Sequence, residues 1–425
     1  MRYESFWQAT APIFDGAADG PVQGSYDVAV IGGGFTGLSA ARRLAMGGAD
    51  VVVLEAERVG AGASARNGGH LNNGIAHGYA DAEKHLGADR AKALYLAYDA
   101  SIEEIERVIA EENISCDFRR AGKLKLASKP SHVAGLRANF ERIHAVVDPD
   151  TAFLEAEDLA GEIGSTAFHG AMRYDKSAMM HMGRYVHGLA EAVVRRGATI
   201  FERAPVTGRR PVAGGFELTT PRGTVTAKTV LVATGAYTTS PFDYHRRRII
   251  SVGSFVVATR PLTEAEVAAT MPGNRTCVTS LNIGNYFRLA PDNRLIFGGR
   301  ARFSATSDQT SDAKSGRILR ASLARIFPQL GEIELEYCWG GLVDMTADRF
   351  PRAGFADGVF YAMGYSGHGA HMANLMGSIV ADQILGRATP NPLAGLSWPA
   401  IPFYSGKPWF LPLVGLWFGF LDATS

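Results

Sequence analysis

The sequence predicts a mixed α/β (α+β) fold in which two structural units are interleaved along the chain. Two observations carry this prediction. Near the N-terminus, apolar runs at 27–31 and 50–54 flank a helical pattern at 36–47, and a strand, a helix and a strand at this spacing form a parallel βαβ unit. Between 249 and 336, short segments alternate apolar and polar residues, which is typical of an antiparallel sheet with one covered face.

The remaining segments, taken in order, are assigned alternately to the two units. Helical periodicity at 87–112 and 129–147 has no glycine-rich loop beside it, so we assign this block to the second unit. A helix at 177–196 and the strands within 198–237 return the chain to the first unit, and a last helix spans about 371–385. The expected division is 24–85, 150–240 and 340–390 for the first unit, 86–149 and 241–339 for the second, and 391–425 for an apolar tail.

Composition excludes several classes of protein. Apolar residues make up 46% of the 425 residues and the net charge is +1, so the chain is globular and has no basic surplus for nucleic acid. Cys116, Cys277 and Cys338 are far apart and form no CxxC motif, which indicates neither a zinc site nor a disulfide framework. The N-terminus lacks a signal-peptide pattern, and we expect a cytoplasmic protein with no bound metal.

The most apolar run of the chain is "PWFLPLVGLWFGFL" at 408–421. It falls short of the about 18 residues that a transmembrane helix needs, and it contains proline and glycine. We expect it to pack on the body of the protein. The alternative is contact with a membrane surface or a partner, because a large exposed apolar patch usually marks an interaction site.

A glycine-rich turn, "GGGFTG", joins the first strand to the first helix and fits the pattern GxGxxG. Gly32 allows the tight turn, Gly34 lets the backbone approach a pyrophosphate, and Gly37 lets helix and strand pack closely. The start of the helix offers free N–H groups to phosphates. Glu55 ends the second strand, where an acid holds ribose hydroxyls and disfavours a 2′-phosphate. The unit is therefore predicted to be a Rossmann-like site for NAD or FAD.

Three further glycine-rich segments favour FAD over NAD. They are "GAGASARNGGH" at 60–70, "TVLVATGAY" at 229–237 and "GYSGHGAHMANLMGSIVAD" at 364–382. Such loops can enclose a long, extended cofactor. The last helix would direct its positive N-terminal end at the flavin, which carries negative charge when reduced.

Taken together, these motifs resemble the FAD-dependent amine and amino-acid oxidoreductases of the D-amino-acid oxidase superfamily, the glycine and sarcosine oxidase group. The resemblance extends over nearly the whole chain. The N-terminal "SFW", the "ASARNGG" loop and the tail are most similar to the γ-glutamylputrescine oxidase branch. The matching segments are "SFWQATAP", "VIGGGFTGLSAARRLA", "LEAERVGAGASARNGGH", "YFRLAPDNRLIFGG", "WGGLVDMTADRFPRAG", "GYSGHGAHMA" and "PFYSGKPWFLPLVG".

The resemblance implies a place for each part of FAD. The glycine-rich turn would hold the pyrophosphate, Glu55 the adenosine ribose, and Val206 the adenine through backbone groups. The segment 60–70 would follow the cofactor toward the flavin, 233–235 would lie near the ADP half, and 367–369 would meet the isoalloxazine ring. The expected FAD-binding residues are Gly32, Gly34, Phe35, Thr36, Gly37, Glu55, Ala56, Ser64, Arg66, Asn67, Gly68, Gly69, His70, Val206, Ala233, Thr234, Gly235, Gly364, Gly367, His368 and Gly369.

We expect the FAD to be held without a covalent bond. Some members of the superfamily link flavin through His or Cys, but Cys277 and Cys338 do not match the linkage positions. His70 either contacts flavin or caps a turn. An oligomer is possible.

The implied chemistry is oxidation of an amine C–N bond. The amine must be neutral to release a hydride, so the site must lower its pKa from about 10 by desolvation or by nearby positive charge. The imine then hydrolyses to an aldehyde or keto acid, and O2 or another acceptor reoxidises the flavin. γ-Glutamylputrescine or a related polyamine is the expected substrate. The alternatives are an oxidase of glycine, sarcosine or D-amino acids, a quinone-linked amine dehydrogenase, a noncatalytic flavin-bound subunit, and an NAD-dependent dehydrogenase.

Five residues are candidates for the substrate side. Tyr286 and Arg288 lie two apart on a predicted strand, hence on one face, and members of the superfamily often clamp a substrate carboxylate with Tyr and Arg. Arg302 stands near the end of the next strand, and Arg349 lies in "TADRFP". His368 is either a base or a donor to the flavin carbonyl. For the arginines, the alternative is a surface or structural ion pair.

Overall fold

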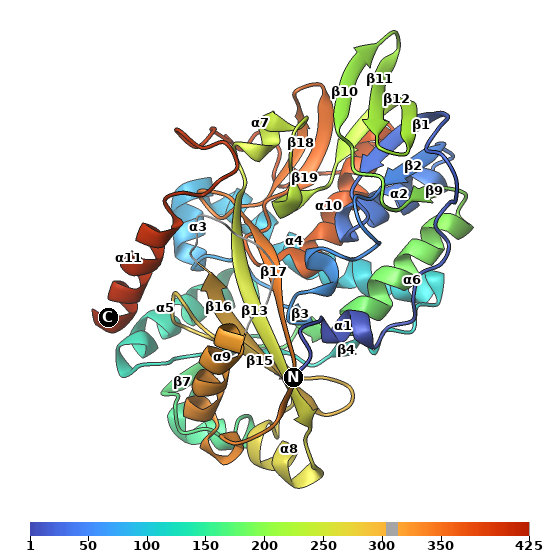
Figure 1. Cartoon of the computed structure of the whole chain (residues 1–425). Helices are drawn as coiled ribbons and strands as arrows, with labels where there is room; N and C mark the ends of the chain where they lie inside the picture. Colours follow the sequence, from blue (N-terminus) through green and yellow to red (C-terminus); the bar gives the residue numbers. More distant parts are fainter. Residues whose placement is uncertain (303–312, 425) are drawn as a thin grey trace.

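The computed structural model describes residues 1–302 and 313–424 (Figure 1). One eight-stranded sheet is built around parallel strands in the order β12-β1-β2-β9, extended by antiparallel β11 and β10. β19 adds to β12 in parallel, and β18 pairs with β19. The strands are β1 (Ser25–Ile31), β2 (Val51–Leu54), β9 (Thr199–Phe201), β10 (Gly208–Val212), β11 (Gly215–Thr220), β12 (Gly223–Val232), β18 (Arg352–Ala356) and β19 (Val359–Met363).

The parallel βαβ unit forms where the sequence predicts it. All four residues of β2 are buried, as expected for a central strand covered on both faces. The connecting helix α2 (Phe35–Met46) packs against α10 (Gly369–Ile384), and the two lie side by side in Figure 1. A Cβ placed on Gly377 of α10 would lie 2.4 Å from the Thr36 carbonyl oxygen, so the close helix crossing requires glycine there.

A second eight-stranded sheet has the order β17-β13-β16-β15-β14-β5-β7-β6 and is mainly antiparallel. The long strands β13 and β17 run from this sheet toward the first one (Figure 1). The strands are β5 (Lys123–Leu126), β6 (Ala152–Glu155), β7 (Gly170–Tyr174), β13 (Ile250–Pro261), β14 (Thr276–Thr279), β15 (Tyr286–Leu289), β16 (Arg294–Arg302) and β17 (Leu335–Met345).

These two sheets confirm the predicted mixed α/β class. Residues 152–155 and 170–174 supply strands to the second sheet, although we assigned 150–240 to the first unit. The boundaries of the two domains stay a prediction.

Helices cover the sheets, and one of them begins later than the sequence suggests. The helix expected at 177–196 is α6 (Met182–Arg195), because Ala178–Met179 forms strand β8, which pairs with β3 (His70–Leu71) and β4 (Arg119–Arg120). The His181 side chain caps α6 by accepting from the Arg184 N–H at 3.2 Å. The other helices are α1 (Phe6–Ala9), α3 (Tyr79–Leu86), α4 (Ala88–Glu112), α5 (Pro130–Val146), α7 (Asp243–Arg246), α8 (Glu264–Thr270), α9 (Ala313–Ile326) and α11 (Leu411–Thr424).

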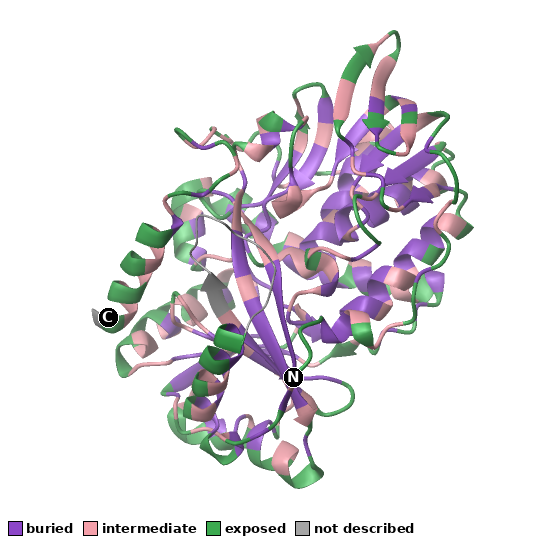
Figure 2. Ribbon diagram, in the orientation of Figure 1, coloured by how far each residue is buried: buried purple, intermediate pink, exposed green. Residues whose placement is uncertain are grey.

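The apolar tail forms helix α11, and its outer face is not packed on the body. Leu416 is 73% exposed and Leu413 is 65% exposed, and Figure 2 shows the helix largely in the exposed and intermediate colours. The expectation of a tail packed on the body is therefore wrong for this face. Within residues 1–302 and 313–424, no helix combines the length and the apolar character needed to cross a bilayer.

Candidate functional site

A cavity of about 710 Å³ is lined by residues from both sheets and from the start of α10. Its size lies within the usual range of small-molecule pockets, about 300–1,000 Å³. Eighteen of the residues expected to bind FAD line it: Gly32, Gly34, Phe35, Thr36, Glu55, Ala56, Ser64, Arg66, Asn67, Gly68, His70, Val206, Ala233, Thr234, Gly235, Gly367, His368 and Gly369.

The glycine-rich turn has no room for side chains. A Cβ on Gly32 would lie 2.8 Å from the Ala233 carbonyl oxygen, and one on Gly37 would lie 1.9 Å from the Gly32 carbonyl oxygen. Gly37 lies outside the cavity lining and keeps α2 against β1. The turn therefore presents bare backbone and the N-terminal end of α2 to the cavity, which suits a pyrophosphate.

Glu55, at the end of β2, is held by backbone donors beside this turn. Its carboxylate accepts from the Gly33 N–H at 2.5 Å and from the Glu57 N–H at 2.9 Å. Burial raises the pKa of Glu55, while the two hydrogen bonds oppose that rise. The fixed carboxylate faces the cavity as an acceptor, as a ribose hydroxyl would require.

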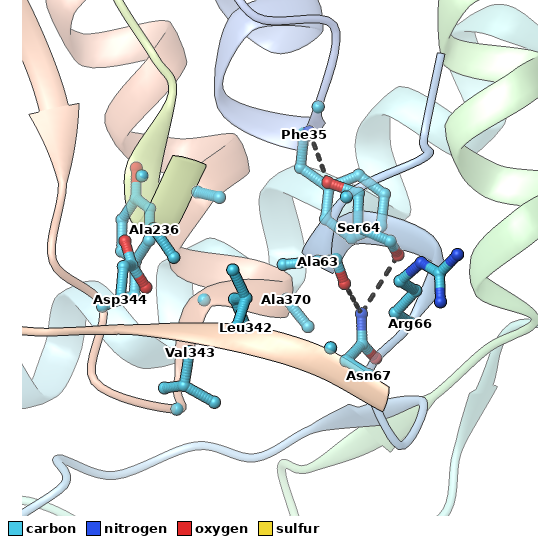
Figure 3. Close-up of a pocket in the computed structure, with 18 of the residues that line it drawn as sticks. Phe35, Ala63, Ser64, Arg66, Asn67, Ala236, Leu342, Val343, Asp344 and Ala370 are labelled. Carbon is cyan, nitrogen blue, oxygen red and sulfur yellow. Dashed lines mark hydrogen bonds between the residues drawn. The ribbon is translucent and has the colours of Figure 1, made fainter. Parts of the chain in front are cut away.

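The loop 60–70 is braced from within and against β17. Ser64 Oγ accepts from the Phe35 N–H at 3.0 Å, and the Asn67 amide donates to Ala63 and Ser64 carbonyls at 3.1 and 3.0 Å (Figure 3). The Arg66 guanidinium donates to the Gly340 carbonyl at 3.0 Å. Gly69 lies behind the lining, where its N–H donates to Asn67 Oδ1 at 2.8 Å. The loop is thus held in one shape by its own chain.

Asp344 lies across the cavity from this loop, beside Leu342 and Val343 of β17 (Figure 3). Its carboxylate accepts from the N–H of Gly364, a residue outside the lining, at 2.6 Å. Burial raises the pKa of Asp344 to about 6. Sequence reasoning missed this residue, although an acid inside the apolar run "WGGLVDM" was a visible signal.

One cross-strand row forms part of the cavity floor. Val278 of β14 pairs with Lys125 of β5 on one side and with Tyr286 of β15 on the other, and all three line the cavity. Tyr286 pairs in turn with Gly298, where a Cβ would lie 2.3 Å from the tyrosine ring. The tyrosine hydroxyl lies 3.3 Å from Ser254 Oγ. Glycine at position 298 therefore leaves the space that the Tyr286 ring occupies.

Lys125 is a cavity residue that sequence reasoning missed. Leu124 and Leu126 point into a separate apolar core, so Lys123 and Lys125 share the opposite face of β5. The pattern "KLKL" in a buried strand was the available signal. Burial and the charge of Arg349 lower the pKa of Lys125.

Arg288 shares a strand with Tyr286 but does not line the cavity. It is 1% exposed, and its guanidinium donates to the carbonyls of Gly69 at 2.7 Å and Met180 at 3.1 Å. Its carbon centre lies 5.2 Å from the centroid of the Trp7 ring. The structure thus places Arg288 behind the loop 60–70, where it braces the backbone.

His368 and His371 stand at the start of α10 and both line the cavity. Burial and the charges of Lys123 and Lys125 lower the pKa of His368 to about 3, so its ring is neutral near pH 7. Both ring nitrogens of His371 and Nδ1 of His368 have no hydrogen-bond partner within the described part of the chain. His371 was missed, although it follows His368 at helical spacing.

Of the two remaining arginine candidates, one is placed by the structure. Arg349 is absent from the lining, and its Nη2 lies 3.1 Å from His77 Nδ1. Arg302 ends β16, and its side chain is outside the described part of the structure.

Comparison with known proteins agrees with this fold. The pattern that defines the DAO family, described as FAD dependent oxidoreductase, matches residues 27–383. A probable oxidoreductase, OrdL, of Haemophilus influenzae is 36% identical over 85% of this chain and 83% of its own. Gamma-glutamylputrescine oxidoreductase of Escherichia coli is 33% identical over 92% of this chain and 90% of its own.

A solved structure shows the same fold. The crystal structure of glycine oxidase from Geobacillus kaustophilus superposes with a TM-score of 0.74 at 24% identity, covering 88% of this chain and 98% of that one. These findings confirm the predicted superfamily and FAD as its cofactor. The chain belongs to the DAO family of FAD-dependent oxidoreductases, which act on amines or amino acids.

Proposed function

We propose that the protein oxidises the C–N bond of γ-glutamylputrescine or a closely related polyamine-derived amine. The charge at one end of the cavity carries this proposal. Lys125 lines the cavity near the start of α10, where its charge lowers the pKa of His368, and the acidic residues in the described lining are Glu55, Glu57 and Asp344. Positive charge and desolvation both lower the pKa of a bound amine and so favour the neutral form that reacts.

Different segments of the chain would bind different parts of FAD. The glycine-rich turn and Glu55 would hold the ADP half of FAD, and the loop 60–70 would hold the part leading to the flavin. The N-terminus of α10 would face the flavin and favour its reduced, negatively charged form. FAD, when bound, supplies the hydride acceptor. The neutral rings of His368 and His371 would line the substrate side of the cavity. Because they carry no charge, they would form no ion pair with the amine.

The balanced reaction of a primary amine gives an aldehyde and ammonia. The carbon next to nitrogen loses a hydride and the nitrogen a proton, and water then adds to the imine and displaces ammonia. The similarity to the Escherichia coli gamma-glutamylputrescine oxidoreductase supports this substrate. The likeness to glycine oxidases supports the second candidate, an oxidase of glycine or sarcosine.

Aerobic turnover tests the proposal. The purified holoprotein is offered γ-glutamylputrescine, putrescine, glycine, sarcosine and D-alanine, and aldehyde or keto acid, amine product and O2 uptake are measured. We expect γ-glutamylputrescine to give aldehyde and ammonia in equal amounts. Turnover of glycine or sarcosine alone would favour the second candidate. Product formation only with an added quinone would identify a dehydrogenase.

The attachment of FAD is tested separately. The three cysteines are buried, and none of them lines the cavity. We propose that FAD is held without a covalent bond. Acid precipitation should release all flavin into the supernatant, and flavin remaining with the pellet would contradict this proposal.

A further inference from the structure

We propose that Lys125 forms a carboxylate-binding subsite on the cavity floor, which takes the acidic end of the substrate. This inference rests on the proposed oxidation of a γ-glutamylated amine and names the residue that recognises its carboxylate. It starts from the placement of Lys125 in β5, at one end of the row Lys125–Val278–Tyr286. All three residues line the same cavity.

The Lys125 ammonium has no hydrogen-bonding or ion-pair partner within the described part of the chain. Lys123, two residues earlier on the same face, is the natural comparison. Its ammonium donates to the Asn73 carbonyl at 2.6 Å and lies 3.7 Å from the centroid of the Tyr174 ring. One buried lysine is therefore satisfied by the protein, whereas its neighbour faces the cavity without a partner.

The charges around Lys125 leave this end of the cavity positive. The charged group that acts on Lys125 is Arg349, another cation. Asp99 and Asp148 act on Lys123 and are held by Lys176, with Asp148 Oδ1 2.8 Å from its ammonium. A desolvated cation without a counter-ion is stabilised most by a carboxylate that the ligand supplies.

The spacing of the row favours a long substrate. Neighbouring strands lie about 4.8 Å apart, so Lys125 and Tyr286 are separated by about 10 Å across β14. Glycine and sarcosine carry amine and carboxylate on one carbon and are too short to contact both residues. γ-Glutamylputrescine separates its carboxylate from its terminal amine, on the putrescine chain, by an amide and two carbon chains, which suits such a distance.

The test compares a substrate that carries the carboxylate with one that lacks the whole amino-acid end. Wild type and Lys125→Met holoproteins are assayed with γ-glutamylputrescine and with N-acetylputrescine, which keeps the amide and the primary amine. We expect the substitution to raise KM for γ-glutamylputrescine by about tenfold more than it raises KM for N-acetylputrescine. Lys125→Arg should restore most of the loss. Lys92→Met, the same change on the exposed face of α4, is the matched control.

A binding measurement keeps this inference separate from the proposed function. Glutarate is titrated into both holoproteins by calorimetry, and we expect binding to wild type that weakens about tenfold or more in Lys125→Met. If no amine turns over but this difference is found, the proposed function fails and the subsite stands. Equal losses for both substrates, or glutarate binding unchanged by the substitution, would overturn the subsite.

A separate observation, the exposed apolar face of α11, points to an interaction surface. Of thirteen exposed large apolar residues in the described chain, six lie between 403 and 420. Four recur at helical spacing on one face of α11, and two precede the helix. The six, which we name the tail patch, are Phe403, Trp409, Leu413, Leu416, Trp417 and Phe420.

We infer that the tail patch docks on an anionic lipid surface. The charged residues within 403–424 are Lys407 and Asp422, and Asp422 is engaged inward, accepting from the N–H groups of Asn282 at 2.9 Å and Ile283 at 2.8 Å. The tail lies beside two arginines, Arg246, which is paired with Asp243 at 2.7 Å, and Arg247. A Cβ on Gly406 would lie 3.0 Å from the Arg246 side chain, and the backbone carbonyl oxygen of the exposed Arg247 accepts from the Ile401 N–H at 3.1 Å.

Aromatic and aliphatic side chains flanked by cations fit a membrane whose surface is negative. A second copy of the same patch fits less well, because it would bring the same cations together. Asp422 also joins α11 to a cavity-lining loop, since Asn282 lines the cavity. Docking would therefore hold that part of the cavity near the lipid.

Vesicle sedimentation tests this second inference. The full-length holoprotein is mixed with vesicles of phosphatidylcholine alone and of phosphatidylcholine with phosphatidylglycerol. We expect binding to the anionic vesicles, weakened about tenfold by the pair Leu416→Ser and Trp417→Ser. Phe355→Ser removes an equally exposed apolar residue (62%) from β18 and should change nothing. No vesicle binding, or a dimer in light scattering that the paired substitution abolishes, would overturn it.

Discussion

Replacing Gly37 by alanine should break the turn on which the cofactor site depends. The added Cβ would stand 1.9 Å from the Gly32 carbonyl oxygen, which is a backbone atom and cannot rotate away. Normal carbon–oxygen contact would require the start of α2 to move by more than 1 Å, roughly, and such overpacking costs about 1–3 kcal/mol. Since about 1.4 kcal/mol corresponds to a tenfold change, we expect FAD affinity to fall by about tenfold to a hundredfold.

The assay pairs FAD titration of the apoprotein with thermal unfolding. Gly135→Ala is the matched control, because Gly135 lies within α5 and a Cβ there meets nothing within 4 Å. Alanine should stabilise that helix by about 0.5–1 kcal/mol and leave FAD binding unchanged. If Gly37→Ala kept both the unfolding temperature and the FAD affinity of the wild type, the close packing of the turn would not be what forms the site.

Other residues give further predictions. Arg288→Met removes the side-chain donor to two buried carbonyls, of which Gly69 keeps the Met180 N–H, so stability should fall by about 1–3 kcal/mol and FAD should bind more weakly. A rise only in KM for acidic substrates would show a clamp instead. The pKa of Asp344 rises from 3.8 to about 6 on folding, so its favourable contribution is present below pH 3.8 and lost as the pH rises through about 6. The unfolding temperature of Asp344→Asn should therefore rise relative to that of wild type as the pH increases from 3.8 to about 6. If the difference between the two unfolding temperatures did not change with pH, the raised pKa of Asp344 would be refuted. Gly298→Ala would meet the Tyr286 ring at 2.3 Å and should raise KM for amines while leaving FAD affinity unchanged.

Local pattern was enough for the cofactor half of the site. The GxGxxG turn, Glu55 and the later glycine-rich loops are contiguous motifs whose conformation is set by nearby residues, and they line one cavity. The βαβ unit followed from hydrophobic periodicity in the same way. The start of α6 could not be read from the sequence, because Ala178–Met179 pairs with strands more than fifty residues away in the chain.

The substrate half depends on contacts between distant segments. Arg288 and Tyr286 share a face of β15, as their spacing predicts, yet the loop 60–70 covers Arg288 and leaves Tyr286 open to the cavity. Lys125 reaches the cavity because β5 and β14 become neighbours in parallel. No local pattern specifies that pairing. The exposure of α11 likewise depends on which of its faces the rest of the protein covers, and no local pattern specifies this.

Anaerobic reduction of the bound flavin tests the central claim most directly. The purified protein should be yellow, with absorbance at about 450 nm. Mixed with γ-glutamylputrescine without O2, it should lose this absorbance within one turnover and recover it when an acceptor is admitted. A yellow protein that neither γ-glutamylputrescine nor any other amine bleaches would contradict the claim that this cavity oxidises an amine C–N bond.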